Sequence, residues 1–540
     1  MEKTAQARYG ELQSNRDYFL SRARASSRLT LPYLIPTANE PTPNTNETYP
    51  VPWNGIGARG CLNLASRMLL ALLPPTQQFF RFSLDEGELG KQGVAPEALS
   101  EMEQALSKIE RLVLREIEAS NDRVVLHEAL LHLIVSGNCL LYIGEEGMRV
   151  FHLNRYVMTR DPMGNPIEAI ICEVLTYDTA PKKVRDTVDQ SRGELKGLPE
   201  ASQNDPLTTE STDYSEIRLY TKITWGDDKI VRWHQEVEGK VIEGTEGRAP
   251  LDVSPWLPLR MTRVDGQMYG VGYVEAAALA DLQTVEALCQ AIAEGSLASS
   301  KVLFLVKPSG VTKARDLANA PNGSFVTGDP NDVLALQVQK STDLAVAMQG
   351  KQQIEARLST AFMLADVRDS ERTTAEEVRL QALQIENSLG SIYSILTTEF
   401  QVPYVNRKLY LMQKSGRVPK MPKELVKPIM TVGLAAVGRG NDLEQLVRFT
   451  TTLGQTIGPE QMATYINESE LIKRLAYSMG IDVNNLVKTE EELAAEQQQA
   501  QQQAMMQMAM ESSDKMANAA KTAQEVQMTA TGQMPPEQSS

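Results

Sequence analysis

The chain has 540 residues, which is too long for a single hydrophobic core, so we expect about two to four domains. Its formal net charge of −15 argues against a surface that grips nucleic acid tightly, because such binding needs many Lys and Arg side chains against phosphates. The charge does not exclude a protein past which DNA slides.

Cysteine usage and the apolar runs indicate where the chain is made. Four widely spaced cysteines in apolar surroundings predict a reducing compartment, and they favour neither a disulfide framework nor a zinc site. The polar N-terminus does not fit a signal peptide, and the apolar runs are shorter than the roughly 20 residues that span a bilayer. These features predict a soluble, intracellular chain with no membrane contact.

Helix patterns dominate the first 137 residues. Residues 1–30 are predicted to be helical, and residues 36–54 form a loop rich in Pro, Asn and Thr. A helix over 58–73 is ended by two prolines, and a helix over 121–136 has Gly137 as its C-cap. Residues 97–118 have the clearest amphipathic pattern, with apolar side chains at helical spacing: Leu106, Ile109, Leu112, Val113 and Ile117.

From residue 139 the pattern changes to strands. The runs "CLLYI", "RVFHL" and "AIIC" are strand-like, with turns between them. Residues 180–213 are polar and are predicted to be an exposed insertion. The run "EIRLYTKITW" then alternates and returns through "GDD" as "KIVRWHQEVEG", which is the best hairpin signal in the sequence. Its alternation places one set of side chains on a shared face: Ile217, Leu219, Ile223 and Trp225.

The second half is mostly helical. A low-charge helix over 274–299 is apolar on most faces, so we expect neighbours to bury it on several sides. A compact segment interrupts at 300–339, and a second long helix follows over 342–365. After the charged loop 366–372, Thr373 begins a third long helix that runs to about residue 400, where Pro403 predicts a kink or stop. Residues 489–511 have high helix propensity without a preferred face, and residues 512–540 are predicted to be disordered.

The stretch "GIGARG" has the spacing of a dinucleotide-binding motif. In such an enzyme Gly55, Gly57 and Gly60 would cradle the pyrophosphate, and Asp85, after the strand-like "FFRFSL", would hold the ribose. Pro50 and Pro52 precede the motif where a buried strand is required, so this alternative is disfavoured. The simpler interpretation is a loop that enters a buried helix, with Gly60 allowing close packing.

The sequence contains no convincing catalytic or metal-binding constellation. His127 and His132 are five positions apart on a predicted helix, which turns them about 140° away from each other, so they cannot share a metal. No P-loop and no nucleophile elbow is present. We therefore expect no enzymatic activity and no cofactor.

Seven segments together point to a family. They are "PWNGIGARGCLNLASRMLLALLPP", "LPLRMTRVDGQMYGVGYVEAAALADLQTVEALCQA", "SSKVLFLVKPSGVT", "GSFVTGDPNDVLALQ", "IEARLSTAFML", "RTTAEEVRLQALQIENSLGSIYSIL" and "GLAAVGRGNDLEQL". In this order they resemble the portal, or head-to-tail connector, proteins of short-tailed podophages of the autographivirus type. The resemblance covers roughly residues 1–490.

The resemblance implies a fold that is α+β but mainly α, assembled as a dodecameric ring around a central channel. The implied parts are a wing (1–273 and 373–423), two stem helices (274–299 and 342–365) that enclose a clip (300–341), a tunnel loop (366–372), a crown (424–490) and a barrel-like helix (491–511) before the tail 512–540. It also implies that no nucleotide binds at "GIGARG".

The implied function is that of a portal at one capsid vertex of a virion, assembled in the bacterial cytoplasm. Double-stranded DNA would enter through it, driven by the terminase large subunit, and would leave through it at ejection. Further implied partners are the tail adaptor and tail proteins, the scaffolding and major capsid proteins, and internal core proteins. The expected channel contacts are Asp366, Arg368, Asp369 and Arg372 in the tunnel loop and Lys307, Lys313 and Arg315 in the clip. A helical scaffold that forms oligomers without a channel remains an alternative.

Overall fold

The computed structural model describes most of the chain up to residue 430 and short pieces beyond it. The described residues are 3–37, 48–75, 78–84, 96–196, 216–300, 303–336, 341–364, 390, 392–419, 426–430, 447–456, 471–472, 505, 515–516 and 519–520. Contacts divide the chain into two units, Met1–Ala436 and Val437–Ser540. In the second unit every described residue is helical.

Five helices build the body of the first unit, by which we mean its described residues 3–273 and 392–430. They are α1 (Ala5–Arg28), α2 (Ile56–Leu72), α4 (Pro96–Ala119), α5 (Asp122–Ser136) and α12 (Val402–Lys414). The first four confirm the helices predicted from sequence. Gly137 ends α5 in the left-handed conformation, with φ 78° and its amide donating to the Leu133 carbonyl. The predicted apolar stripe of α4 is buried except for Leu112, which is 41% exposed.

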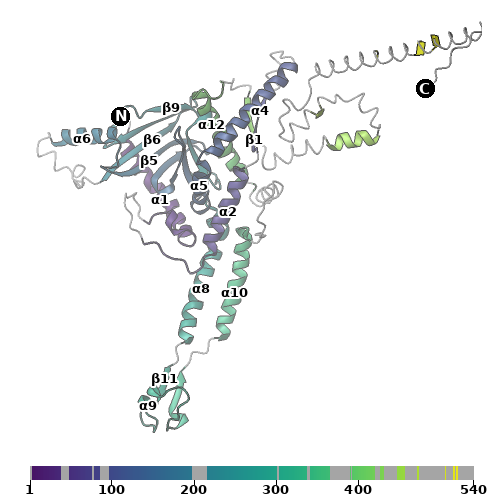
Figure 1. Ribbon diagram of the computed structural model, residues 1–540. Coiled ribbons are helices and arrows are strands. Elements are labelled where there is room, and N and C mark those ends of the chain that lie inside the picture. The colour runs from purple at the N-terminus through teal and green to yellow at the C-terminus, as the bar shows by residue number, and fades with distance from the viewer. Residues whose placement is uncertain are drawn as a thin grey trace, which may run out of the picture. The chain divides into compact units, whose positions relative to one another are not determined.

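Two antiparallel sheets lie beside these helices (Figure 1). One has the order β10-β2-β3, formed by Trp256–Arg260, Asn138–Ile143 and Met148–His152. The other has the order β4-β5-β6-β7-β8, with β9 also pairing with β7. Its strands are Tyr156–Arg160, Pro166–Thr176, Glu216–Trp225, Ile230–Val237, Lys240–Val241 and Gly247–Pro250. The predicted hairpin is confirmed as β6 and β7, joined by a turn in which Lys229 has φ 58°.

The polar insertion predicted at 180–213 is partly wrong. Residues Lys182–Lys196 form the helix α6, which buries Val184 and Val188 against the six-stranded sheet. Two apolar residues four positions apart are enough to anchor one face of a helix whose remaining side chains are polar. Residues 197–213 lie outside the described part of the chain.

A pair of long antiparallel helices leaves the body and is joined through a small insert. The helices are α8 (Leu279–Ser300) and α10 (Ser341–Ala361), which lie side by side in Figure 1. We call them the helical hairpin. The insert, residues 303–336, holds the strands β11 (Leu303–Val306) and β12 (Val333–Leu336) and the short helix α9 (Ala314–Asn319). The sequence predicted a compact segment here but not the helix α9.

Two helices contain π-helical turns. One spans Val274–Ala278 directly before α8, and the other spans Thr397–Gln401 directly before α12. Pro403 does not stop the second helix: residues 392–414 are helical without a break, and the π-helical turn that ends at Gln401 lies where the proline removes one amide from the helical hydrogen bonds. The short elements of the first unit complete the list: the 3₁₀ turns Pro32–Leu34, Leu153–Arg155, Leu251–Val253 and Pro330–Asp332, and the strand pair β1 (Phe80–Leu84) and β13 (Val426–Met430).

One main apolar core holds the body together. The second half of helix α5 lies in its centre: every residue from Ala129 to Ser136 is buried, with Leu130, Leu133 and Ile134 at 0% exposure. This core continues into the first turns of the hairpin through Leu282 and Val285 of α8 and Ile354 and Leu358 of α10. Beyond these residues, toward the insert, no described side chain of the hairpin is buried.

Candidate functional site

The insert is built around one buried carboxylate. Asp332 Oδ2 accepts hydrogen bonds from the amides of Val311 at 2.9 Å and Thr312 at 3.3 Å. The Thr312 hydroxyl also accepts from the Asp329 amide at 2.8 Å. A Cβ on Gly310 would lie 2.4 Å from the Asp332 carboxyl carbon, so only glycine allows this approach. These bonds fix the loop that carries the basic residues of the insert.

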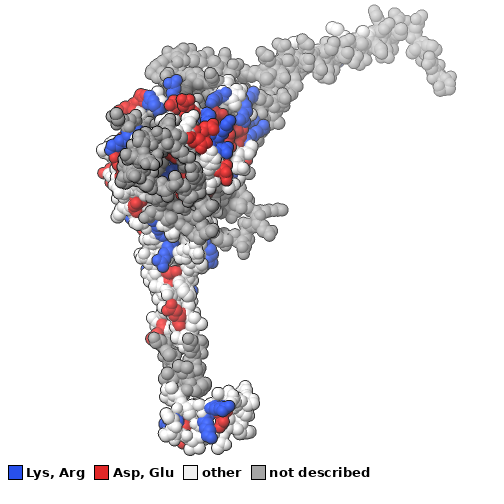
Figure 2. Space-filling model, turned by 90° about the vertical axis from the view of Figure 1, so that its left-hand side faces the viewer, with Lys and Arg blue, Asp and Glu red and all other residues white. Residues whose placement is uncertain are grey.

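The three basic residues predicted as channel contacts lie on this fixed framework. Lys307 follows β11, Lys313 caps α9 at its N-terminus, and Arg315 lies on α9. All three side chains are exposed, and none forms an ion pair within the described part of the chain. They are the source of the blue patches on the insert at the bottom of Figure 2, since the described insert has no other Lys or Arg. The arrangement can meet phosphate groups of a partner.

The four residues predicted in the tunnel loop, Asp366, Arg368, Asp369 and Arg372, lie outside the described residues. Their role stays a prediction. Asp85, the ribose contact of the enzyme alternative, also lies outside them.

The glycines of "GIGARG" serve helix packing. The helix α2 begins at Ile56, so Gly57 and Gly60 are inside it, and both are buried. A Cβ on Gly57 would lie 2.6 Å from the Leu29 carbonyl, and one on Gly60 would lie 2.4 Å from the Phe362 ring. Neighbouring groups therefore cover the backbones of Gly57 and Gly60, so the dinucleotide alternative is not favoured and the packing interpretation of Gly60 is confirmed.

The segment before α2 is fastened to both helices of the hairpin, which sequence reasoning missed. Glu286 of α8 accepts from the amides of Trp53 at 2.9 Å and Asn54 at 3.2 Å. The Asn54 side chain donates to Glu355 of α10 at 2.8 Å and accepts from the Ile56 amide at 2.7 Å. The available signal was weak: Asn54 precedes a helix, but its partners lie more than 200 residues away.

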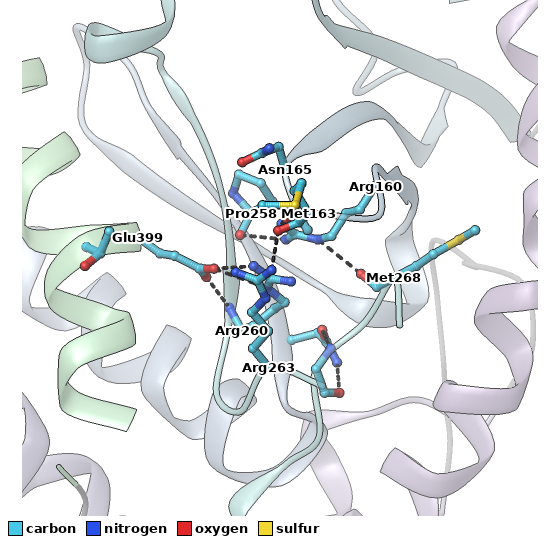
Figure 3. Close-up of polar contacts among 12 residues, drawn as sticks. Arg160, Met163, Asn165, Pro258, Arg260, Arg263, Met268 and Glu399 are labelled. Atoms are coloured by element: carbon cyan, nitrogen blue, oxygen red, sulfur yellow. Dashed lines mark hydrogen bonds and ion pairs between the residues drawn. The ribbon is translucent and has the colours of Figure 1, made fainter. Parts of the chain in front are cut away.

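A second polar cluster joins the two sheets of the body to the helical turn before α12 (Figure 3). Arg260 of β10 donates to Glu399 through its backbone amide at 3.1 Å, Nε at 3.2 Å and Nη2 at 2.5 Å. Glu399 lies in the π-helical turn before α12. Among the described residues no carboxylate pairs with Arg160, which donates to the carbonyls of Met268, Gly164 and Pro258 at 2.9–3.1 Å.

This cluster has more positive than negative side chains, with Arg160, Arg260 and Arg263 against Glu399 (Figure 3). Burial, and then the neighbouring Arg260 guanidinium, lower the pKa of Arg160 to about 10. Arg263 lies next to it and donates to the Met163 carbonyl. Carbonyl dipoles compensate the excess positive charge, and the result is a structural junction of the β4–β5 turn, β10 and the helix before α12.

The described residues meet the requirements of neither a metal site nor a membrane-spanning helix. Among the described residues no group of three His, Cys, Asp or Glu side chains is arranged to hold a metal ion. None of the described helices has an apolar stretch of the length required to cross a bilayer.

The two histidines of "HEALLH" lie in different surroundings. His132 stacks on His152 at 5.8 Å between ring centroids, whereas His127 lies near Ser66.

Comparison with known proteins gives consistent results. The family model described as bacteriophage head to tail connecting protein matches residues 2–487. The portal protein of Escherichia phage T7 is 37% identical over 520 residues, which are 94% of this chain and 92% of that protein. The portal protein of Enterobacteria phage T3 is 37% identical over 503 residues, which are 92% and 90% of the two chains. A chain from the neck of an empty GTA particle covers 79% of this chain and 90% of its own length, with a TM-score of 0.37 and 12% identity, which is too weak a likeness to carry an argument.

Proposed function

The chain belongs to the family of bacteriophage head to tail connecting proteins, and from this premise we propose that it is the portal of a phage capsid. The similarity to the portal proteins of phages T7 and T3 extends over nearly the whole chain, so it covers the body, the hairpin and the insert alike. A connecting protein has a structural role, which agrees with the expectation of a chain without enzymatic activity.

We propose that the working form is a dodecameric ring around a channel. The observation that supports it is the surface of the hairpin. Between Glu286 and Gln353 neither helix buries a described side chain, although this stretch has few charges. Apolar and small side chains remain exposed there, with Leu297 and Val346 both at 66%. Copies of the same hairpin, packed side by side, would cover this surface.

Within this proposal double-stranded DNA passes the ring twice. The terminase large subunit drives it inward during packaging, and it leaves through the same channel at ejection. The tail adaptor docks to the completed head, and the scaffolding, major capsid and internal core proteins meet the ring during assembly. The family resemblance supports these partners. The net charge of −15 per chain supports a channel to which DNA does not adhere, because adhesion needs many cation–phosphate contacts.

The first test is the mass and shape of the purified protein. One chain weighs 59.7 kDa, so twelve copies weigh 12 × 59.7, or about 716 kDa. Light scattering on a sizing column should give this mass, and electron-microscope class averages should show a ring with an axial hole as wide as duplex DNA. A monomer or dimer would contradict the ring. A closed oligomer without a hole would favour the scaffold alternative.

The second test concerns the basic residues. We expect that reversing the charge of Lys307, Lys313 and Arg315 together, or of Arg368 and Arg372 together, lowers the amount of genome packaged or retained per particle. Lys182→Glu is the matched control, because Lys182 is exposed on α6 of the body. If both reversals leave packaging and retention at the level of the control, these residues do not contact DNA in function.

A further inference from the structure

Trp53 stands apart from the other tryptophans of the chain. It is 55% exposed, whereas Trp256 is 6% exposed and Trp225 and Trp233 are half-buried. Val51, two residues before it, is 88% exposed. We call Val51 and Trp53 the apolar ridge. A large exposed aromatic side chain beside an exposed aliphatic one is the composition of an interface anchor.

The ridge is held in place by the hairpin itself. The Glu286 carboxylate binds the Trp53 amide directly, and the next residue is tied to α10 through Asn54 and Glu355. Asn54 is 9% exposed, so its bonds to the hairpin are partly shielded from water, whereas the bond between the Trp53 amide and Glu286 is exposed. Because the backbone is already ordered, packing the ridge against a partner would cost little further conformational entropy.

The opposite side of the hairpin offers a complementary surface. At about 100° per residue, Thr284 and Ala291 of α8 lie roughly 160° and 140° around the helix from Glu286. On α10, Val346 lies about 180° around from Glu355 by the same rule. All three side chains are exposed and uncharged. Four charged residues border this side: Asp281 and Arg357, which pair with each other at 2.7 Å, and the exposed Glu294 and Asp343.

We propose that the apolar ridge of one copy packs against the uncharged face of the next copy, formed by Thr284, Ala291 and Val346. This rests on the proposed ring. In a closed ring of identical chains each contact joins two different faces from opposite sides of the protomer. The apolar ridge and the uncharged face lie on opposite sides of the hairpin, as such a contact requires. The partner is therefore a second copy of this chain, and Trp53 is the anchor of the contact.

Substitution on both sides of the contact tests the proposal. Trp53→Ala and Ala291→Glu should each raise the protein concentration at which the ring dissociates by at least tenfold, measured by light scattering over a dilution series. Tyr33→Ala is the matched control, since Tyr33 is also 55% exposed but lies on the Pro32–Leu34 turn. It should leave the dissociation concentration unchanged.

Tryptophan fluorescence gives a second readout that does not depend on stability. The contribution of Trp53, taken as the difference between wild type and Trp53→Phe, should be shielded from acrylamide in the ring. If the rings form but Trp53 stays accessible and Trp53→Ala dissociates like the control, the ridge contact is wrong and the ring stands. If wild type forms no ring at any concentration, the ring and this contact are both overturned.

Discussion

The body and the helical hairpin bury their side chains to very different extents. The body has a continuous apolar core and encloses ion pairs, such as Asp122–Lys408 at 2.6 Å with side chains 2% and 7% exposed. Among its described side chains the hairpin buries those near the body, at Leu282, Val285, Ile354 and Leu358. Its ion pairs Arg357–Asp281 and Lys351–Glu355 are partly exposed.

This difference separates two sources of stability. The body buries enough apolar surface to fold within one chain, and it can carry buried charges because each has partners. The outer hairpin leaves apolar side chains such as Leu297 and Val346 exposed in the single chain. The proposed assembly of identical subunits would explain why the body is fully packed and the outer hairpin is not.

The largest effect that distinguishes the two parts comes from their ion pairs. Lys408→Ala leaves the Asp122 carboxylate buried beside the Tyr404 hydroxyl at 2.7 Å, and we expect it to lower the free energy of unfolding by about 3–5 kcal/mol. Arg357→Ala on the hairpin should cost at most about 1 kcal/mol, because its pair is exposed to solvent. Urea denaturation followed by circular dichroism measures both. Equal losses would remove the distinction between body and hairpin.

The junction between body and hairpin gives the next largest effect. Gly60→Ala places a methyl group 2.4 Å from the Phe362 ring, and we expect a loss of about 1–3 kcal/mol from the forced displacement. Gly10→Ala is the control, because nothing lies within 4 Å of its Cβ position on α1. It should be neutral or stabilising by up to about 1 kcal/mol, through higher helix propensity. A Gly60→Ala protein as stable as the control would mean that α2 does not pack closely against the end of α10.

Local patterns predicted the elements of the body well. The helix over 121–136, its cap at Gly137 and the hairpin of β6 and β7 follow from spacing and turn chemistry, and the structure confirms each. The helix α6 was missed because only Val184 and Val188 mark its buried face, and the sheet they contact is assembled from distant strands. A weak local signal gains its meaning only from the tertiary partner.

The candidate site was predictable in part. Family resemblance and charge identified Lys307, Lys313 and Arg315, and the structure places all three on the surface of the insert. The contacts that attach the hairpin, from Glu286 and Glu355 to Asn54, could not be predicted. They join residues 232 and 301 positions apart, and a single Glu on a helix carries no sign of its partner.

A substitution in the insert tests whether the insert and the body unfold separately. Asp332→Ala removes the acceptor of the Val311 and Thr312 amides, and we expect a local loss of about 1–2 kcal/mol. Hydrogen exchange should quicken at residues 310–312 while amides of α5 keep their protection. Asp316→Ala on the exposed α9 is the control and should change neither. Faster exchange in α5 as well would show that the insert and the body unfold together.

The smallest expected effect is the loss of stability of the body at acid pH. Burial, followed by the charges of His132, Arg155 and Arg16, lowers the pKa of His152 well below its usual value, and its Nδ1 is shielded from solvent although part of the residue reaches the surface. His152 of the unfolded chain therefore binds a proton near pH 6.5, whereas in the folded chain it stays neutral at that pH. The free energy of unfolding falls as the pH drops below that value. One proton corresponds to a slope of at most about 1.4 kcal/mol per pH unit. Urea titrations between pH 7 and pH 5.5 should show the slope in wild type and a smaller one in His152→Gln. An unchanged slope in His152→Gln would show that His152 is not the source of the acid sensitivity.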